Sequence, residues 1–176
     1  MDKNNSADRA IYIGEDVYGK FKSFLIASLA SLLSSFDQQQ NQLEFYAQSW
    51  SKYTISARLF SNLFAYIDKH FVAREKFENK RPILSIHELC MASWKCEIVA
   101  KVYGVLTDLF MLKLRDNRRG MGELDVFSMK MFTSSLFITQ QYEAFEELYM
   151  KECESFYVAE AKDMDQCDPY ELIKKV

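Results

Sequence analysis

The sequence predicts an all-α protein, built as an elongated stack of long antiparallel helices. No segment alternates between apolar and polar residues with the period of two that a half-buried strand shows. Neither glycine nor proline occurs between Gly19 and Pro82. Between Gln42 and Val72, apolar residues recur in steps of three and four, which is typical of one buried helical face. These positions are Tyr46, Trp50, Tyr53, Ala57, Phe60, Phe64, Ile67 and Phe71.

Composition and charge exclude several classes of protein. Apolar residues make up 49% of the 176 residues, which excludes a disordered chain. The net charge is −3 and no run of Lys or Arg exceeds two, so we expect no nucleic-acid partner. The most apolar run, Phe24–Phe36, has 13 residues and contains four serines. A membrane span needs about 20 apolar residues, so this run predicts a core helix and no membrane partner.

The cysteines and the first residues indicate a compartment. Cys90, Cys96, Cys153 and Cys167 have no CxxC spacing and lie within helical patterns, as free thiols of a reducing compartment would. Residues 1–10 lack the hydrophobic core of a secretory signal. We therefore expect a cytoplasmic location, a nuclear location, or both.

The first half of the chain predicts two helices joined by a short turn. We expect residues 1–14 to be disordered because they are mostly polar. A helix over Glu15–Phe36 follows, then a glutamine-rich turn and a helix over Gln42–Lys76 that would be roughly 50 Å long. Glu78–Leu84, which contains a proline, would end that helix and reverse the chain. The inner face of the first helix is predicted at Val17, Phe21, Phe24, Leu25, Leu29, Leu32 and Phe36. On the long helix, Trp50, Phe64 and Ile67 are expected to be almost fully buried.

A capping box predicts the start of the next helix. In Ser85-Ile-His-Glu88, the serine hydroxyl and the glutamate carboxylate can each accept a backbone N–H of the other residue. Gly120 is the predicted C-cap. Three arginines in the last turns either complement the helix dipole or contact an acidic partner. They are Arg115, Arg118 and Arg119. The predicted apolar stripe is Ile86, Leu89, Cys90, Trp94, Ile98, Val102, Val105, Leu109 and Leu112.

Two further helices and the start of a third are predicted in the last third of the chain. The first is marked by Leu124, Phe127, Met131 and Leu136. The second is marked by Tyr142, Phe145, Tyr149, Cys153 and Phe156, and should end near Ala161. Asp168-Pro169 combines an N-cap with proline at the first helical position, which predicts a new helix from Pro169.

No group of residues in the sequence supports catalysis, so we expect that the protein is not an enzyme and needs no cofactor. His87-x-x-Cys90 could place two metal ligands one helical turn apart, but a zinc site needs two more and no recognisable spacing supplies them. We therefore predict no metal site. Gly120-Met-Gly122 lacks the third glycine and the Lys-Ser/Thr pair of a phosphate-binding loop.

Several motifs closely resemble the N-terminal scaffold region of cullins of the SCF ubiquitin-ligase type. Tyr66–Val72 is similar to the Tyr-Leu-Asp/Asn-Arg-aromatic-Val run of the first cullin repeat. Leu43–Trp50 matches a Leu-x-Phe-Tyr-x-x-x-Trp helix, and Val17–Leu25 resembles the helix before it. Trp94-Lys95 and Asn117–Gly120 resemble the Trp-Arg helix that ends in Glu-Arg-x-Gly-Glu, with the last glutamate displaced to residue 123.

The resemblance implies a division of the chain and an expectation about its ends. Residues 15–122 would form an incomplete first cullin repeat and residues 123–176 the beginning of a second. Relative to a full cullin, the chain would be truncated at both ends, lacking two earlier helices and the C-terminal domain that holds the RING subunit. The open ends would expose two apolar surfaces and favour self-association. One surface would lie along Glu15–Phe36 and Ile86–Leu112, and the other at Leu136, Tyr142 and Phe156.

The resemblance also implies a function. The chain would be a non-catalytic scaffold module of a cullin–RING ubiquitin ligase, acting in ubiquitin-dependent protein catabolism. It would bind a Skp-type adaptor with its F-box protein, and a truncated form could only occupy the adaptor unproductively. By register from Trp94, the adaptor-facing residues would be Lys101, Gly104 and Val105. Two structural alternatives remain open, since Val105 also belongs to the apolar stripe and Gly104 could serve close helix packing. The alternative function is a helical-rod subunit of a membrane-trafficking tether.

Overall fold

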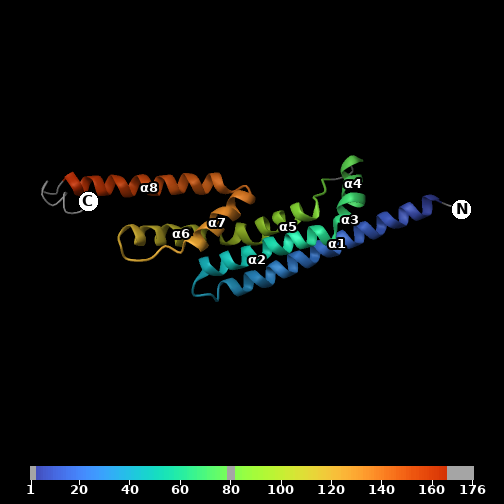
Figure 1. Cartoon of the computed structure of the whole chain (residues 1–176), viewed down its shortest axis with the longest axis horizontal. Coiled ribbons are helices and arrows are strands. Elements are labelled where there is room, and N and C mark those ends of the chain that lie inside the picture. The colour runs from blue at the N-terminus through green and yellow to red at the C-terminus, as the bar shows by residue number, and fades with distance from the viewer. Residues whose placement is uncertain (1–2, 79–81, 166–176) are drawn as a thin grey trace.

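A computed structural model describes residues 3–78 and 82–165 of the chain as an elongated assembly of helices (Figure 1). Every regular element within these ranges is helical, which confirms the all-α prediction. Helices α1 (Lys3–Phe36), α2 (Gln42–Leu63) and α5 (Ile86–Trp94) run side by side in alternating directions. Helices α6 (Ala100–Arg118) and α8 (Tyr142–Asp165) extend beyond the end of this group where α1 ends and α2 begins (Figure 1). The start of α1 and the end of α8 lie at opposite ends of the long axis.

Helix α1 spans Lys3–Phe36 and therefore begins twelve residues before the predicted Glu15. The expectation of a disordered N-terminus is wrong for residues 3–14. Once a helix is nucleated, adding residues without proline has little cost, so a polar segment joins a neighbouring helix easily. Gly14 is buried within α1 and faces η1, a later π-helical turn. A Cβ atom at Gly14 would lie 3.0 Å from the Cβ and Cγ atoms of Phe71, so glycine permits this approach.

The predicted long helix over Gln42–Lys76 is wrong as a single element. Helix α2 spans Gln42–Leu63, after which Phe64 leaves helical geometry with φ −99° and ψ 19°. The chain continues as α3 (Ala65–Ile67), the π-helical turn η1 (Asp68–Val72) and α4 (Ala73–Phe77), which turn away from the axis of α2 (Figure 1).

Contacts with distant segments fix this bend. Asp68 Oδ1 accepts the Ile86 N–H at 2.9 Å. Phe71 and Val72 are buried in a small cluster with Ile83. A straight helix would leave these groups without their partners, so the tertiary contacts outweigh the local preference for an unbroken helix.

The next rod consists of three elements in series. Helix α5 spans Ile86–Trp94, the π-helical turn η2 spans Lys95–Val99, and α6 spans Ala100–Arg118. The Ser85 capping box is present, as predicted. The predicted C-cap is also confirmed: Gly120 has φ +69°, its N–H bonds to Asn117 O, and the Met121 N–H bonds to Asp116 O. This pair of bonds is a Schellman motif.

Helix α7 spans Val126–Ile138, and α8 spans Tyr142–Asp165, beyond the predicted end near Ala161. Asp125 is the N-cap of α7 and accepts the Ser128 N–H at 3.0 Å. A second Schellman motif ends α7, with Gln140 in the left-handed region at φ 57°. The buried side of α7 differs from the predicted one, because Phe127 is exposed and Met131 only half-buried. The side chains that α7 buries are Ser128, Met129, Phe132, Ser135 and Leu136.

Burial of the predicted core residues is mixed. Trp50 is buried as predicted, and so are Phe21, Leu25, Leu29 and Phe36 of α1. Phe24 is 54% exposed, so its prediction is wrong. Phe64 and Ile67 are only half-buried, because they lie where α2 breaks, at the edge of the cluster that contains Phe21 of α1 and Leu89 of α5. Leu136 is fully buried, so it does not belong to the open surface expected at the second end of the stack.

The arginines at the end of α6 connect this helix to α8. Arg115 Nε lies 2.9 Å from Glu152 Oε1, and Arg118 Nη2 lies 3.0 Å from Cys153 Sγ. The Arg118 guanidinium also covers the rings of Phe156 and Tyr157, at 4.9 and 5.4 Å. Arg119 is exposed. Two of the three arginines therefore hold α8 against α6, a role that neither sequence interpretation included.

Some predictions concern residues outside the described ranges. The Asp168-Pro169 helix start and Cys167 both lie there. Among the described residues, Cys90, Cys96 and Cys153 are free thiols. No helix formed by the described residues has the length and apolarity that crossing a membrane requires.

Candidate partner-binding surface

The helix that carries the candidate residues is fixed first at its N-terminal end. Ser85 Oγ accepts the Glu88 N–H at 3.3 Å, and Glu88 Oε2 accepts the Ser85 N–H at 2.8 Å. Lys76 from α4 adds an ion pair to the same carboxylate at 3.2 Å. The hydrogen bonds from Ser85, with help from Lys76, lower the pKa of the Glu88 carboxyl from its ordinary value of 4.5 to about 2. The start of α5 is thereby joined to the arm formed by η1 and α4.

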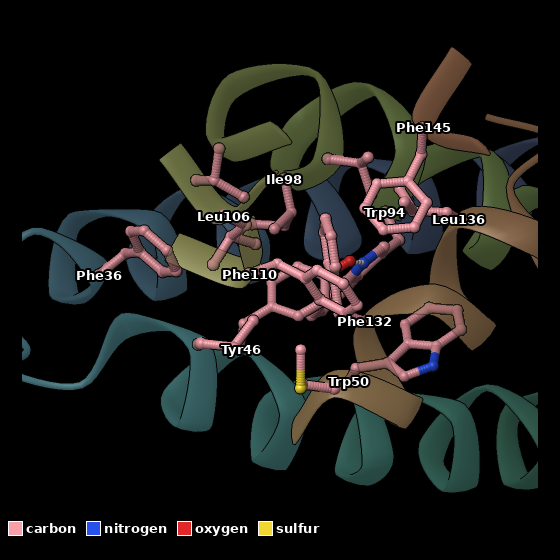
Figure 2. Close-up of a cluster of buried hydrophobic side chains, with 14 of the residues drawn as sticks. Phe36, Tyr46, Trp50, Trp94, Ile98, Leu106, Phe110, Phe132, Leu136 and Phe145 are labelled. Carbon is pink, nitrogen blue, oxygen red and sulfur yellow. Dashed lines mark hydrogen bonds between the residues drawn. The ribbon is translucent and has the colours of Figure 1, made fainter. Parts of the chain in front are cut away.

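The middle of the rod is fixed by a chain of buried hydrogen bonds across three helices, and Figure 2 shows two of the residues in it, Trp94 and Tyr46. Trp94 Nε1 donates to the Tyr46 hydroxyl at 3.1 Å. The Tyr46 and Ser135 hydroxyl oxygens are 2.7 Å apart, and the Ser135 hydroxyl donates to the Phe132 carbonyl at 2.7 Å. Each donor in this order has an acceptor, so the buried polar atoms are satisfied. Burial raises the pKa of Tyr46 to about 12 and keeps its hydroxyl protonated.

The π-helical turn η2 decides which side of α6 faces the core. A π-helical turn includes one residue more than an α-turn, so it rotates the helix that follows. The predicted stripe continued from Val102 through Val105, Leu109 and Leu112 at α-helical spacing. In the structure, the buried line is instead Trp94, Ile98, Val102, Leu106 and Phe110, in uniform steps of four. Val105 and Leu112 are each 48% exposed, so their assignment to the core is wrong.

The three candidate residues lie together on the exposed side of α6. Lys101 is exposed and its Nζ forms an ion pair with Glu97 Oε2 at 2.9 Å. Gly104 is exposed, and a Cβ atom there would meet no atom within 4 Å, so this glycine does not serve close helix packing within the described chain. Val105 follows Lys101 by one helical turn on the same face.

Two further residues complete this face, and the sequence interpretation did not assign them to it. Leu112 follows Val105 by two turns, and the exposed Asp108 lies between them. The uniform spacing of four from Trp94 to Phe110 was visible in the sequence and could have indicated them. We call Lys101, Gly104, Val105, Asp108 and Leu112 the α6 surface.

A shallow cleft borders the α6 surface. Its volume is about 430 Å³, and it lies between the start of α6 and the turn from α7 to α8. Ala100 and Tyr103 line one side, next in sequence to Lys101 and Gly104. The strained Gln140 lines the other side together with Gln141, Glu143 and Ala144. The described residues contain no cluster of three or more His, Cys, Asp or Glu side chains able to hold a metal ion.

Comparison with known proteins identifies the family that shares this helical architecture. A family model for the cullin alpha solenoid domain matches residues 5–176. The chain belongs to the cullin family. It is similar to Cullin-1 of Dictyostelium discoideum, with 24% identity over 186 residues that cover 97% of this chain and 24% of that protein. Cell division control protein 53 of Saccharomyces cerevisiae is 28% identical over 94 residues, covering 52% of this chain and 11% of that protein.

A third cullin relative gives the same result. Cullin-1 of Schizosaccharomyces pombe is 28% identical over 102 residues, which cover 56% of this chain and 13% of that protein. The chain therefore spans no more than 24% of the length of these curated cullins. Family membership confirms the cullin resemblance of the sequence and its fold class. It does not test the predicted boundary between two repeats at residues 122 and 123.

Proposed function

We propose that this chain is a non-catalytic scaffold module of a cullin–RING ubiquitin ligase, and that its α6 surface binds a Skp-type adaptor carrying an F-box protein. The cullin family match supports the scaffold role. It also favours this function over a membrane-trafficking tether, which no observation on the described residues supports. Binding would hold the adaptor and its substrate receptor at a fixed place, without chemistry from this chain.

One observation carries the proposal: η2 turns Val105 and Leu112 outward. Each is 48% exposed on a helix whose opposite side is anchored in the core by Val102, Leu106 and Phe110. A rigid helix that presents apolar side chains two turns apart is suited to receive a partner helix. Its side chains need no refolding, so little ordering entropy opposes binding.

The polar residues of the α6 surface suit the edge of such a contact. Lys101 is paired with Glu97, and this pair would stay at the solvent-accessible rim, where charged side chains influence specificity and association rate. Gly104 leaves space beside Val105, so a partner side chain can approach the backbone of α6.

The test is calorimetric binding of the purified chain to a purified Skp-type adaptor–F-box complex. Val105→Asp places a carboxylate at the centre of the contact and should weaken binding at least about tenfold. Val126→Asp is the matched control, because Val126 is 67% exposed on α7 and does not belong to the α6 surface. The control should bind as the wild type does. Equal affinity of both variants, or no binding by the wild type, would contradict the proposal.

A further inference from the structure

Helix α2 carries a second apolar stripe, on the side opposite to its buried face. Ile55, Leu59 and Leu63 follow one another in steps of four, so they share one side of α2, and Tyr66 follows them in α3. Their side chains are 58%, 62%, 72% and 70% exposed, respectively. The core face, with Tyr46, Trp50 and Ala57, lies on the other side of the helix. We call the four exposed residues the α2 stripe.

The charges around the α2 stripe have one sign. Lys52, Arg58 and Lys69 are exposed, and the sequence contains no Asp or Glu between Glu44 and Asp68. Asp68 itself accepts the Ile86 N–H. A partner for this surface therefore needs apolar side chains accompanied by carboxylates.

Helix α8 has the complementary character on its outer side. Its inner side packs on α6 and α7 through Phe145, which is 3% exposed. The exposed apolar residues on the other side are Met150 and Val158, at 60% and 48%, while Tyr157 lies beside this side with one face of its ring covered by Arg118. Exposed glutamates accompany them along the helix, namely Glu143, Glu146, Glu147, Glu154 and Glu160.

We propose that copies of this chain associate head to tail, with the outer side of α8 of one copy packed along the α2 stripe of the next. Met150 and Val158 would contact Leu59 and its neighbours, while Glu147 and Glu154 would face the cations beside the stripe. The two surfaces have comparable lengths, since Ile55–Leu63 and Met150–Val158 each extend over roughly 12 Å at the helical rise.

The contact is heterologous, because two different surfaces meet. Such contacts build rings when the rotation closes and open chains when it does not. A single pair of helices buries less than the roughly 800 Å² per partner of a standard interface, so association is expected in the micromolar range. The surfaces are separate from the α6 surface, so this proposal does not rest on adaptor binding.

Sedimentation velocity of the purified chain across the micromolar range tests the proposal. The wild type should form species that grow with concentration. Leu59→Glu in the α2 stripe and the double variant Met150→Lys, Glu154→Lys in α8 should each weaken self-association at least about tenfold. Met121→Glu is the matched control, since Met121 is 65% exposed and lies outside both surfaces. It should associate as the wild type does, and circular dichroism should show that every variant is folded.

Mixing the two defective variants gives the decisive result. The Leu59→Glu chain keeps its α8 and the α8 variant keeps its α2 stripe, so together they should form a one-to-one complex that grows no further. A wild type that stays monomeric throughout the range overturns the proposal. So does a Leu59→Glu variant that associates normally, or an α8 variant that still self-associates, since that would mean that the α2 stripe pairs with another surface.

Discussion

The two π-helical turns, η1 and η2, have different effects on the path of the chain. At η1, the backbone leaves the axis of α2, and the arm it forms is held by Gly14, Ile83 and Ile86, which are all distant in sequence. At η2, residues on both sides of the turn enter the same core, Trp94 before it and Val102 after it, and the rod continues from α5 into α6. The turn η1 therefore accompanies a change in the direction of the chain, whereas η2 changes which side of α6 faces the core. The tertiary contacts around each turn decide which of these two outcomes occurs.

The largest expected difference between the two kinds of helical turn is in the stability of single-residue deletion variants. Deleting Asp108 from the α-helical part of α6 rotates the residues after it by about 100° and removes Phe110 from the core, at a cost of roughly 3–5 kcal/mol. Deleting the exposed Cys96 from η2 removes the extra residue and leaves both flanking faces in place, so it should cost only about 1 kcal/mol. Urea unfolding compares them. A Cys96 deletion as harmful as the Asp108 deletion would mean that η2 does more than set the rotation of α6.

Substitution of two helical glycines, one packed against η1 and one beyond η2, should change the stability by intermediate amounts and in opposite directions. Gly14→Ala puts a methyl group 3.0 Å from Phe71 of η1, and the resulting strain should exceed the gain in helix propensity, with a net loss of about 1 kcal/mol. Gly104→Ala, beyond η2, meets no atom within 4 Å and should stabilise the protein by about 0.5–1 kcal/mol. Thermal unfolding of both variants measures the difference. Equal shifts in the same direction would show that η1 adapts to the added methyl group.

The smallest expected effect on the free energy of unfolding concerns Glu88, which joins α5 to the η1 arm. The folded-state pKa of its carboxyl, about 2, lies below the ordinary 4.5, so the carboxylate stabilises the fold above that ordinary value. This contribution is lost as the pH falls from about 4.5 to about 2. The stability difference between wild type and Glu88→Gln should therefore be largest near neutral pH and shrink on acidification. Urea unfolding at several pH values checks this, and a difference independent of pH would contradict it.

Features that depend on near neighbours in sequence could be predicted. The Ser85–Glu88 capping box and the Gly120 C-cap each involve only a few adjacent residues, and both are present. Trp50 was placed correctly because the first half of α2 is regular. The side chains of Phe64 and Ile67 were misplaced because the break in α2 is held by residues elsewhere in the chain.

The α6 surface was also predicted only in part, because the side of α6 that faces the core depends on η2. The sequence predicted that Lys101, Gly104 and Val105 lie on one helix, and the structure has all three on α6, but the sequence left open whether Val105 is buried. The extra residue in η2 leaves no sign in composition, and only the steps of four from Trp94 to Phe110 indicate it. The apolar stripe of α2 was also missed, because the stronger aromatic pattern on the opposite side of that helix accounted for its length.

The position of the two tryptophans has a practical consequence for spectroscopy. Trp50 and Trp94 are the only tryptophans in the chain, both are buried, and their ring centroids are 5.3 Å apart. Intrinsic tryptophan emission therefore reports on one location, where α2, α5 and α7 meet, and is insensitive to the outer part of α8 and to the η1 arm. Far-ultraviolet circular dichroism reports on every helix. Unfolding curves from the two signals should coincide if the rod melts as one unit, and a gap between them would measure how independently its ends come apart.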